Sequence, residues 1–218
     1  MILHLVTDRV RLCADGDESA RRDCLLSQAR FAVAAGIDVI QLRERDLEAR
    51  QLVALATAIV ELARGSSTRV VVNERLDVAL AAGTAGVHLR GDSLPAARVR
   101  SVVPPGFLIG RSVHSVADVQ RAGPVDYVIA GTVWATSSKP DRHPLLGPDG
   151  LAAVVAASHI PVIGIGGVEV GRATALASAG AAGGAAVGAF QRLGSGCLAI
   201  PLQTVTRVFR RAFVAANM

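Results

Sequence analysis

The chain has 218 residues, 51% of them hydrophobic, and a formal net charge of +5. This length is enough for one well-packed domain and too short for two full ones. No apolar run reaches the roughly eighteen residues of a membrane span, and Asp8 and Arg9 interrupt the N-terminal apolar run, so we expect a cytoplasmic protein without a membrane segment or signal sequence.

The basic residues favour a small anionic partner over a nucleic acid. They are scattered along the chain, and one Trp, one Tyr and five Phe offer few platforms for base stacking. A single lysine, Lys139, stands among the 23 basic residues, and its compact ammonium is not interchangeable with a guanidinium. The three cysteines, at positions 13, 24 and 197, lack any paired spacing, so we predict neither a disulfide framework nor a zinc site.

Short β-rich runs alternate with longer amphipathic segments from one end of the chain to the other. The predicted strands are Leu3–Thr7, Asp38–Leu42, Val70–Asn73, Gly86–Leu89, Phe107–Gly110, Tyr127–Ala130, Val162–Ile165 and Gly184–Val187. The predicted helices cover residues 19–35, 46–64, 75–82, 95–103, 115–122, 148–158, 170–179 and 198–215. This alternation is typical of a parallel α/β fold, and the continuous apolar strands indicate a sheet covered on both faces.

Two parallel architectures compete at this point. An open doubly wound sheet would carry a Gly-x-Gly-x-x-Gly turn after the first strand, whereas residues 7–11 read Thr-Asp-Arg-Val-Arg. We therefore predict a (β/α)8 TIM barrel, a single domain over residues 1–218. Because barrels of this kind carry their reactive groups at the C-terminal ends of the strands, the residues after each strand are the functional candidates.

The segment after the second strand carries three hydrogen-bond donors. In an extended segment the alternating side chains of Gln41, Arg43 and Arg45 face the same side. Two converging guanidiniums make an anion clamp for phosphate or pyrophosphate oxygens. The alternative is a structural salt bridge that involves Glu44 and Asp46 and caps the following helix.

The third and fourth strands are followed by residues that suit a substrate or a hydrated magnesium ion. Asn73 and Glu74 end the third strand, and Asp92 and Ser93 follow the fourth. Each pair also has a structural interpretation, because Asn73 and Ser93 are residue types that commonly cap the N-terminus of a helix.

The fifth strand leads to a hydroxyl and an imidazole. Ser112 is a candidate catalytic hydroxyl, and His114 is able to act as an acid or a base near neutral pH. The alternative for His114 is a purely structural role at the start of a helix.

The sixth strand leads into the longest candidate lid. Thr136, Ser138 and Lys139 form a predicted phosphate-binding set, and the polar loop continues through His143 to Gly147. The alternative is a loop that is merely solvated.

Glycines follow the last two strands. Gly166 and Gly167 come after the seventh strand, and Val187 and Gly188 come at the eighth. Bare backbones of this kind let amide N–H groups approach an anion, so we predict a phosphate site here. Tight packing alone is the competing reason for the glycines.

Taken in order, the motifs resemble the thiamine phosphate synthase and TenI superfamily. The resemblance runs from residue 3 to about residue 190 and rests on Leu5-Val6-Thr7-Asp8, Gln41-Leu42-Arg43-Glu44-Arg45, Val72-Asn73-Glu74-Arg75-Leu76-Asp77, Gly86-Val87-His88-Leu89, Ile109-Gly110-Arg111-Ser112-Val113-His114-Ser115, Thr136-Ser137-Ser138-Lys139 and Ile165-Gly166-Gly167. It implies a barrel with a pocket for a thiazole phosphate.

Thiamine phosphate synthases join a pyrimidine diphosphate to a thiazole phosphate with Mg²⁺ and lose pyrophosphate. Their pattern matches Gln41 and Arg43, but Arg45 replaces a lysine here. Glu74 stands where one metal-binding aspartate is usual. Ser93 stands where the second belongs, with Asp92 one place before it. The resemblance thus implies Mg²⁺ on Glu74 and Asp92 if the chain is a synthase, and the loss of one carboxylate should weaken that binding.

TenI proteins resemble the chain more closely in Arg43-Glu44-Arg45 and in residues 110–115, and they need no cofactor. Their known activity moves a proton to give the aromatic isomer of a thiazole phosphate. The usual histidine position is Thr132 here, whose hydroxyl pKa is far too high for a base, so we hypothesise that His114 or His143 relays the proton.

We therefore expect an enzyme of the TenI type that binds a small phosphorylated substrate, most simply a thiazole tautomerase. The alternatives are a thiamine phosphate synthase and a non-catalytic binding or regulatory protein. The oligomeric state stays open, because the apolar positions of the last predicted helix suit either the barrel or a second copy in a homodimer. These positions are Ile200, Leu202, Val205 and Val208.

Overall fold

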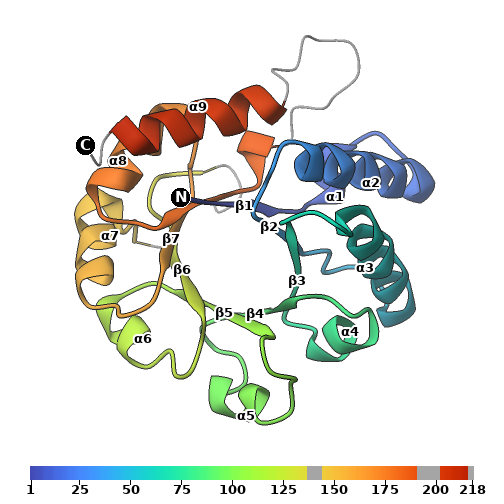
Figure 1. Cartoon of the computed structure of the whole chain (residues 1–218), viewed down its shortest axis with the longest axis horizontal. Helices are drawn as coiled ribbons and strands as arrows, with labels where there is room; N and C mark the ends of the chain where they lie inside the picture. Colours follow the sequence, from blue (N-terminus) through green and yellow to red (C-terminus); the bar gives the residue numbers. More distant parts are fainter. Residues whose placement is uncertain (137–143, 191–201, 216–218) are drawn as a thin grey trace.

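The computed structural model describes residues 1–136, 144–190 and 202–215 and shows a closed barrel of parallel strands (Figure 1). The strands are β1 (Ile2–Val6), β2 (Val39–Leu42), β3 (Arg69–Asn73), β4 (Gly86–Leu89), β5 (Leu108–Val113), β6 (Tyr127–Gly131), β7 (Val162–Ile165) and β8 (Gly183–Ala186). Each strand pairs with the next, and β8 pairs with β1, where Leu3 lies opposite Gly184. The predicted (β/α)8 TIM barrel is confirmed.

The strand boundaries differ from the prediction mainly at β5. The predicted strand ends at Gly110, but the observed one runs on through Arg111 to Val113 beside β6. A buried arginine breaks the apolar pattern that marks a strand. It is tolerated because its guanidinium donates to the carbonyl oxygens of Ser93, Leu94 and Ala122. The observed β8 begins one residue before the predicted eighth strand and ends one residue before it, at Ala186.

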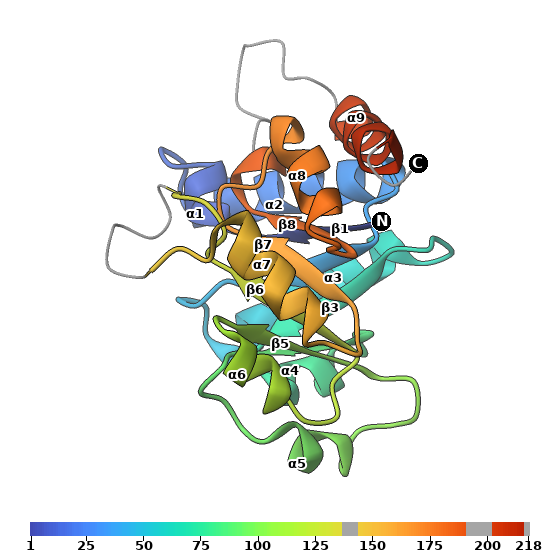
Figure 2. The same ribbon diagram turned by 90° about the vertical axis from the view of Figure 1, so that its left-hand side faces the viewer.

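Helices surround the barrel on its outside (Figures 1 and 2). They are α1 (Arg9–Leu12), α2 (Glu18–Ala34), α3 (Ala49–Ala63), α4 (Leu76–Ala81), α5 (Ala96–Arg100), α6 (Val116–Gln120), α7 (Gly147–Ala156), α8 (Ala173–Ser178) and α9 (Leu202–Ala215), with 3₁₀ turns η1 (Val170–Arg172) and η2 (Gly188–Phe190). The short elements α1 and η2 were not predicted, and the predicted helix 170–179 divides into η1 and α8. No helix in the described ranges is long and apolar enough to cross a bilayer.

The last helix, α9, lies across the barrel wall and contacts both α8 and α2, so it closes the ring of helices. Its buried face is formed by Leu202, Thr206, Phe209 and Phe213, a helical spacing that turns Val208 outward. Of the four positions expected to be apolar and packed, only Leu202 is fully buried, Val205 is partly buried, and Ile200 lies outside the described residues.

Two predicted helix caps are wrong. The N-cap of α4 is Arg75 and that of α5 is Pro95, and neither side chain caps its helix by a hydrogen bond. Asn73 instead ends β3, where its Oδ1 accepts a hydrogen bond from Gln41 at 3.0 Å. The main-chain carbonyl of Ser93 accepts from Arg111. Neither side chain therefore caps the helix that follows.

A buried ion cluster fixes the loop after β2. Arg9 of α1 forms ion pairs with Glu44 at 3.2 Å, Asp46 at 2.7 Å and Glu18 at 2.9 Å. The hydroxyl of Thr7 donates to Glu44 at 2.6 Å and accepts from the Arg43 N–H at 3.0 Å. The structural alternative proposed that Glu44 and Asp46 cap the next helix. They pair with Arg9 instead.

The pairing of Glu44 is needed because this carboxylate is almost completely removed from water. Its side chain is 2% exposed, as is that of Arg9. Burial raises the pKa of the Glu44 carboxyl, and the hydrogen bonds from Thr7 and Arg9 oppose that rise. The cluster joins the ends of β1 and β2 and so holds the segment that carries Arg43 and Arg45.

Replacing Arg9 should make the protein less stable against unfolding. We expect Arg9→Ala to lower the free energy of unfolding by about 3–5 kcal/mol, because it leaves Glu44 buried without its partner. Urea denaturation followed by circular dichroism measures this change. Arg64→Ala is the matched control, since Arg64 pairs with Glu61 on the surface, and it should cost less than about 1 kcal/mol. Equal costs for the two variants would contradict the role of the cluster.

Candidate active site

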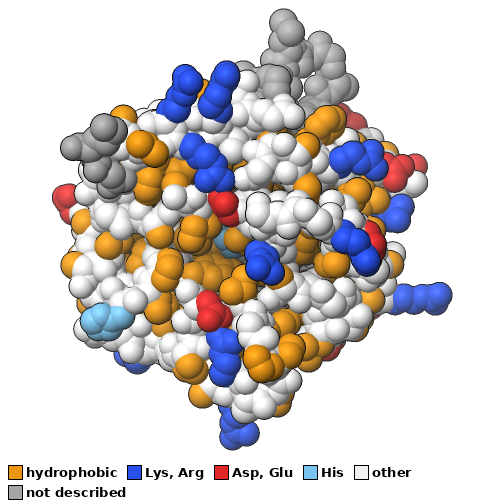
Figure 3. Space-filling view, viewed as in Figure 1, with side chains coloured by type: hydrophobic (Ala, Val, Ile, Leu, Met, Phe, Trp, Pro, Cys, Tyr) orange, Lys and Arg blue, Asp and Glu red, His pale blue; other side chains and the backbone are white. Residues whose placement is uncertain are grey.

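A cavity of about 1300 Å³ opens at the C-terminal ends of the strands. It is lined by predicted site residues from both halves of the barrel, namely Gln41, Arg43, Arg45, Asn73, Asp92, Ser112, His114, Thr132, Thr136, Gly166, Gly167, Val187 and Gly188. Glu74 is not among the lining residues, and Ser138, Lys139 and His143 lie outside the described residues. Figure 3, viewed along the barrel, shows hydrophobic side chains near the centre with basic ones around them.

One side of the cavity carries polar side chains from neighbouring strands. Gln41 of β2 donates from Nε2 to Asn73 Oδ1 of β3 at 3.0 Å, and its Oε1 lies 2.9 Å from His4 Nε2 of β1. On the next pair of strands, His88 Nε2 lies 2.9 Å from Ser112 Oγ. Sequence reasoning missed both histidines. The available signal was a histidine inside a predicted apolar strand.

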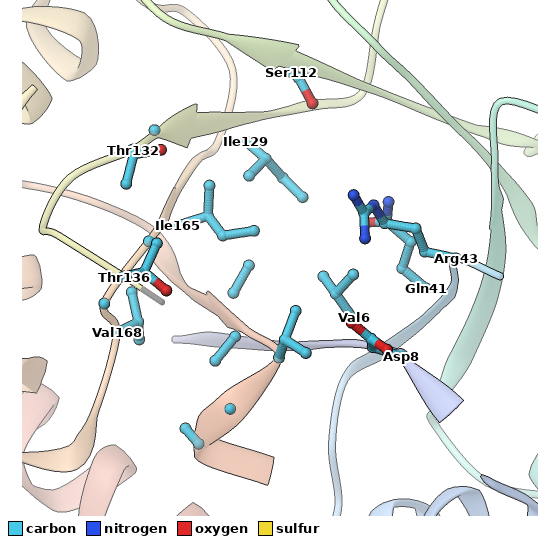
Figure 4. Close-up of a pocket in the computed structure, with 18 of the residues that line it drawn as sticks. Val6, Asp8, Gln41, Arg43, Ser112, Ile129, Thr132, Thr136, Ile165 and Val168 are labelled. Carbon is cyan, nitrogen blue, oxygen red and sulfur yellow. The ribbon is translucent and has the colours of Figure 1, made fainter. Parts of the chain in front are cut away.

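The opposite side of the cavity is apolar. Ile129 and Ile165 face inward from β6 and β7, and Figure 4 shows them across the cavity from Arg43. Val6 of β1 also faces inward, and it lies beside Arg43. Ala185 of β8 completes this wall and is fully buried. A wall of this kind keeps water from the centre of the cavity and suits the face of a flat apolar ring.

The two arginines after β2 bring positive charge to the cavity. Figure 4 shows the Arg43 guanidinium directed into it. Burial, followed by the neighbouring Arg45 charge, lowers the pKa of Arg43. Neither arginine forms a salt bridge with another described residue, because Arg9 holds Glu44 and Asp46 instead. The Asp8 carboxylate also lines the cavity, and its charge partly opposes the fall in the Arg43 pKa. Two adjacent guanidiniums outside any salt bridge favour the binding of an anion.

The two carboxylates expected to hold a metal contact an arginine instead. Arg90 donates its backbone N–H to Glu74 at 2.5 Å, and its guanidinium makes two hydrogen bonds to Asp92 at 2.9 and 3.0 Å. The same guanidinium lies 3.7 Å from Glu74. Within the described ranges no three His, Cys, Asp or Glu side chains come together as metal ligands do. As placed, Glu74 and Asp92 do not form an open pair of ligands.

His114 links the ends of β5 and β6. Its Nδ1 makes a short hydrogen bond with the carbonyl oxygen of Gly131, which fixes the ring beside Thr132, and its backbone N–H donates to Asp118 at 2.9 Å. Since Nδ1 donates to a carbonyl, Nε2 is the nitrogen available for proton exchange. Thr132 itself is buried at the edge of the cavity.

The glycines after β7 have a packing role. Gly166 has φ +100° and Gly167 φ +62°, and a Cβ on Gly166 would lie 2.3 Å from Thr132 Cγ2. The carbonyl of Gly167 accepts from Arg172 at 2.6 Å, and this arginine also lies over the ring of Trp134. Tight packing therefore accounts for these two glycines whether or not they meet a ligand.

The glycine after β8 has no such packing role. Among the described residues other than its two chain neighbours, a Cβ on Gly188 would meet no atom within 4 Å, yet Gly188 lines the cavity at the start of η2. The turn is anchored from outside, because the buried Gln28 of α2 donates to the carbonyl oxygen of Phe190 at 2.8 Å. Gly188 is thus the position where a bare backbone faces only the cavity.

Known proteins share both the sequence and the fold. The family model described as thiamine monophosphate synthase matches residues 10–190. The thiamine-phosphate synthase of Methanoculleus marisnigri is 45% identical over 163 residues, which cover 74% of this chain and 77% of that protein. The thiamine-phosphate synthase of Albidiferax ferrireducens is 38% identical over 199 residues, which cover 90% and 87%.

A solved structure gives the same result. The thiamine phosphate pyrophosphorylase from Pyrococcus furiosus superposes with a TM-score of 0.80 at 26% identity, over 100% of this chain and 97% of that one. The relatives carry the names of enzymes, and the expectation that this chain is an enzyme is confirmed. The match of the family model over most of the chain shows that the protein belongs to the thiamine monophosphate synthase family.

Proposed function

We propose that the chain is a thiamine phosphate synthase, which couples hydroxymethylpyrimidine diphosphate to a thiazole phosphate and releases pyrophosphate. The observation that carries the proposal is one cavity with two guanidiniums on one side, neither in a salt bridge with another described residue, and a glycine turn on another side, as two phosphorylated substrates require. The relatives named as synthases support it. The thiazole tautomerase, which was the main expectation from the sequence, finds no support in these names.

The reaction creates negative charge in one place and positive charge in another. The bond between the pyrimidine methylene carbon and the diphosphate oxygen breaks, and its electron pair leaves on pyrophosphate. The lone pair of the thiazole nitrogen then forms the new C–N bond. We assign Arg43 and Arg45 to the departing pyrophosphate, because a partly buried guanidinium stabilises developing negative charge more than an exposed one does.

The apolar wall has a complementary task. A cation-like pyrimidine would react with water if water reached it. Val6, Ile129 and Ile165 exclude water from the centre of the cavity and offer their faces to the two rings. We place the thiazole phosphate at the turn after β8, where Gly188 leaves the backbone open to the cavity.

Magnesium is the cofactor that the synthase reaction implies, whereas the tautomerase implies none. A hard cation of this kind takes carboxylate oxygens and substrate phosphates as ligands. Glu74 and Asp92 do not fit that task as placed, because both face the Arg90 guanidinium, and a cation between them would have to displace it. We therefore derive no step of the reaction through a metal, and we assign the neutralisation of pyrophosphate to the arginines.

One assay separates the three candidate functions. Purified protein is incubated with each thiazole phosphate isomer, with and without the pyrimidine diphosphate and Mg²⁺, and thiamine phosphate and ring isomerisation are followed. We expect thiamine phosphate only when both substrates are present. Isomerisation without the diphosphate would identify a tautomerase, and tight binding without any turnover would identify a binding protein.

Removing the charge of Arg43 should slow the coupling. We expect Arg43→Gln to lose about 2–4 kcal/mol of transition-state stabilisation, which corresponds to a fall in kcat/KM of roughly 30- to 1000-fold. Pyrophosphate release measures the rate. Arg50→Gln, on the exposed surface of α3, is the matched control and should leave kcat/KM unchanged. A near-normal rate for Arg43→Gln would show that this arginine is structural.

A methyl group at Gly188 should test the phosphate site without disturbing the fold. Because a Cβ there meets no atom of the described residues beyond its chain neighbours, Gly188→Ala should change the free energy of unfolding by less than about 0.5 kcal/mol. The same methyl group would stand where the phosphate approaches, so the KM for the thiazole phosphate should rise about ten-fold. An unchanged KM would show that the phosphate does not bind at this turn.

A further inference from the structure

Two buried histidines beneath the cavity have no role in the proposed reaction. His4 of β1 and His88 of β4 each make one side-chain hydrogen bond, through Nε2, to Gln41 and to Ser112. Within the described part of the chain, Nδ1 of each ring is buried and has no hydrogen-bond partner. Burial lowers the pKa of His4 to about 4 and that of His88 to about 3, so both rings are neutral at physiological pH.

A neutral imidazole has one N–H donor and one nitrogen lone pair, and the surroundings decide which nitrogen carries the proton. A buried N–H group without an acceptor is among the rarest arrangements in folded proteins, and a bare lone pair is tolerated better. The unpartnered Nδ1 atoms of His4 and His88 are therefore the lone pairs. Each proton sits on Nε2, where an acceptor is within hydrogen-bond distance.

For His4 this assignment sets the direction of a chain of hydrogen bonds. His4 Nε2–H donates to Gln41 Oε1 at 2.9 Å, so the amide nitrogen of Gln41 must face Asn73. Gln41 Nε2 then donates to Asn73 Oδ1 at 3.0 Å. The oxygen of Asn73 is used in this contact, and its amide N–H group remains for the cavity that Asn73 lines. The opposite His4 tautomer would reverse both amides and present an oxygen instead.

For His88 the same reasoning applies to a hydroxyl. His88 Nε2–H donates to Ser112 Oγ at 2.9 Å and occupies one of its lone pairs. The hydroxyl proton of Ser112 therefore points away from His88. Figure 4 shows the Ser112 oxygen directed into the cavity. Asn73 and Ser112 thus both offer hydrogen-bond donors from the polar side of the same cavity.

We propose that His4 and His88 are positioning residues whose Nε2–H tautomers make the polar side of the cavity a hydrogen-bond donor surface that selects an aromatic ring with acceptor nitrogens. The inference rests on the proposed function in one respect, which is that the ring is the pyrimidine of the diphosphate substrate. His4 does not line the cavity, and His88 lines it with a side chain that is almost completely buried. They act through the orientation of the Gln41 and Asn73 amides and of the Ser112 hydroxyl.

The first test reads the tautomers directly. The histidine ring nitrogens of the full-length protein, labelled with ¹⁵N, are assigned by comparison with His4→Gln and His88→Gln, and their chemical shifts distinguish Nε2–H from Nδ1–H. We expect Nε2–H at both histidines from pH 6 to pH 8. A proton on Nδ1 of either ring would overturn the inference. This measurement needs no substrate and no turnover.

The second test reads the selection of the ring. The KM and kcat for hydroxymethylpyrimidine diphosphate are compared with those for an analogue in which one ring nitrogen is replaced by C–H. We expect the wild-type protein to prefer the pyrimidine over the analogue. In His4→Leu this preference should fall about ten-fold, because one hydrogen bond to the ring is lost. The loss should appear in the KM of the diphosphate, while the KM of the thiazole phosphate stays constant. His159→Leu, at an exposed position, is the matched control.

The outcomes of these tests are separable from those of the proposed function. An unchanged preference in a folded His4→Leu protein would overturn the inference and leave the synthase assignment intact. If the wild-type protein forms no thiamine phosphate, the proposed function fails. Calorimetry with the pyrimidine compound and its C–H analogue then measures the same preference as a ratio of Kd values. If the His4→Leu protein does not fold, the ¹⁵N measurement of the histidine tautomers in the wild-type protein still tests the inference.

Discussion

The pairing of β8 with β1 is the constraint on which the rest of the structure depends. It closes the sheet, so the ends of all the strands meet around one opening. Close approach of the two strands requires a residue without a side chain, since a Cβ on Gly183 would lie 1.9 Å from the carbonyl oxygen of Ile2. Through this closure Arg43 after β2 and Gly188 after β8, 145 positions apart in sequence, line one cavity.

Closure also determines which charges remain available to a ligand. Arg9 follows β1 and reaches the loop after β2 because these strands are neighbours, and it takes Glu44 and Asp46 as partners. Arg43 and Arg45 alternate with these acids along the chain and are left facing the cavity without a salt bridge to another described residue. A buried ion cluster that looks purely structural thus keeps two acids away from the arginines to which we assign the pyrophosphate.

The polar side of the cavity is organised in layers. The buried rings of His4, His88 and Tyr127 pack together, with centroids 5.7–6.4 Å apart, and of these three rings His88 also reaches the cavity. Gly110 makes room for this packing, because a Cβ there would lie 2.2 Å from the Tyr127 ring. The lower layer fixes rings by packing, and the rings then orient amides and hydroxyls in the layer above.

The sequence by itself determined the class of fold, because apolar runs of strand length alternating with amphipathic segments leave few architectures, and the missing glycine turn after residue 7 removed the open sheet. Most of the site residues that it identified line the cavity, since the position just after a strand is readable in one dimension. The tertiary structure alone decided the partners. That Arg9 holds Glu44, that Arg90 lies between Glu74 and Asp92, and that His4 and His88 support the cavity wall depend on contacts between different strands and loops. Such contacts follow from strand register and closure, which the local pattern of a single sequence does not specify.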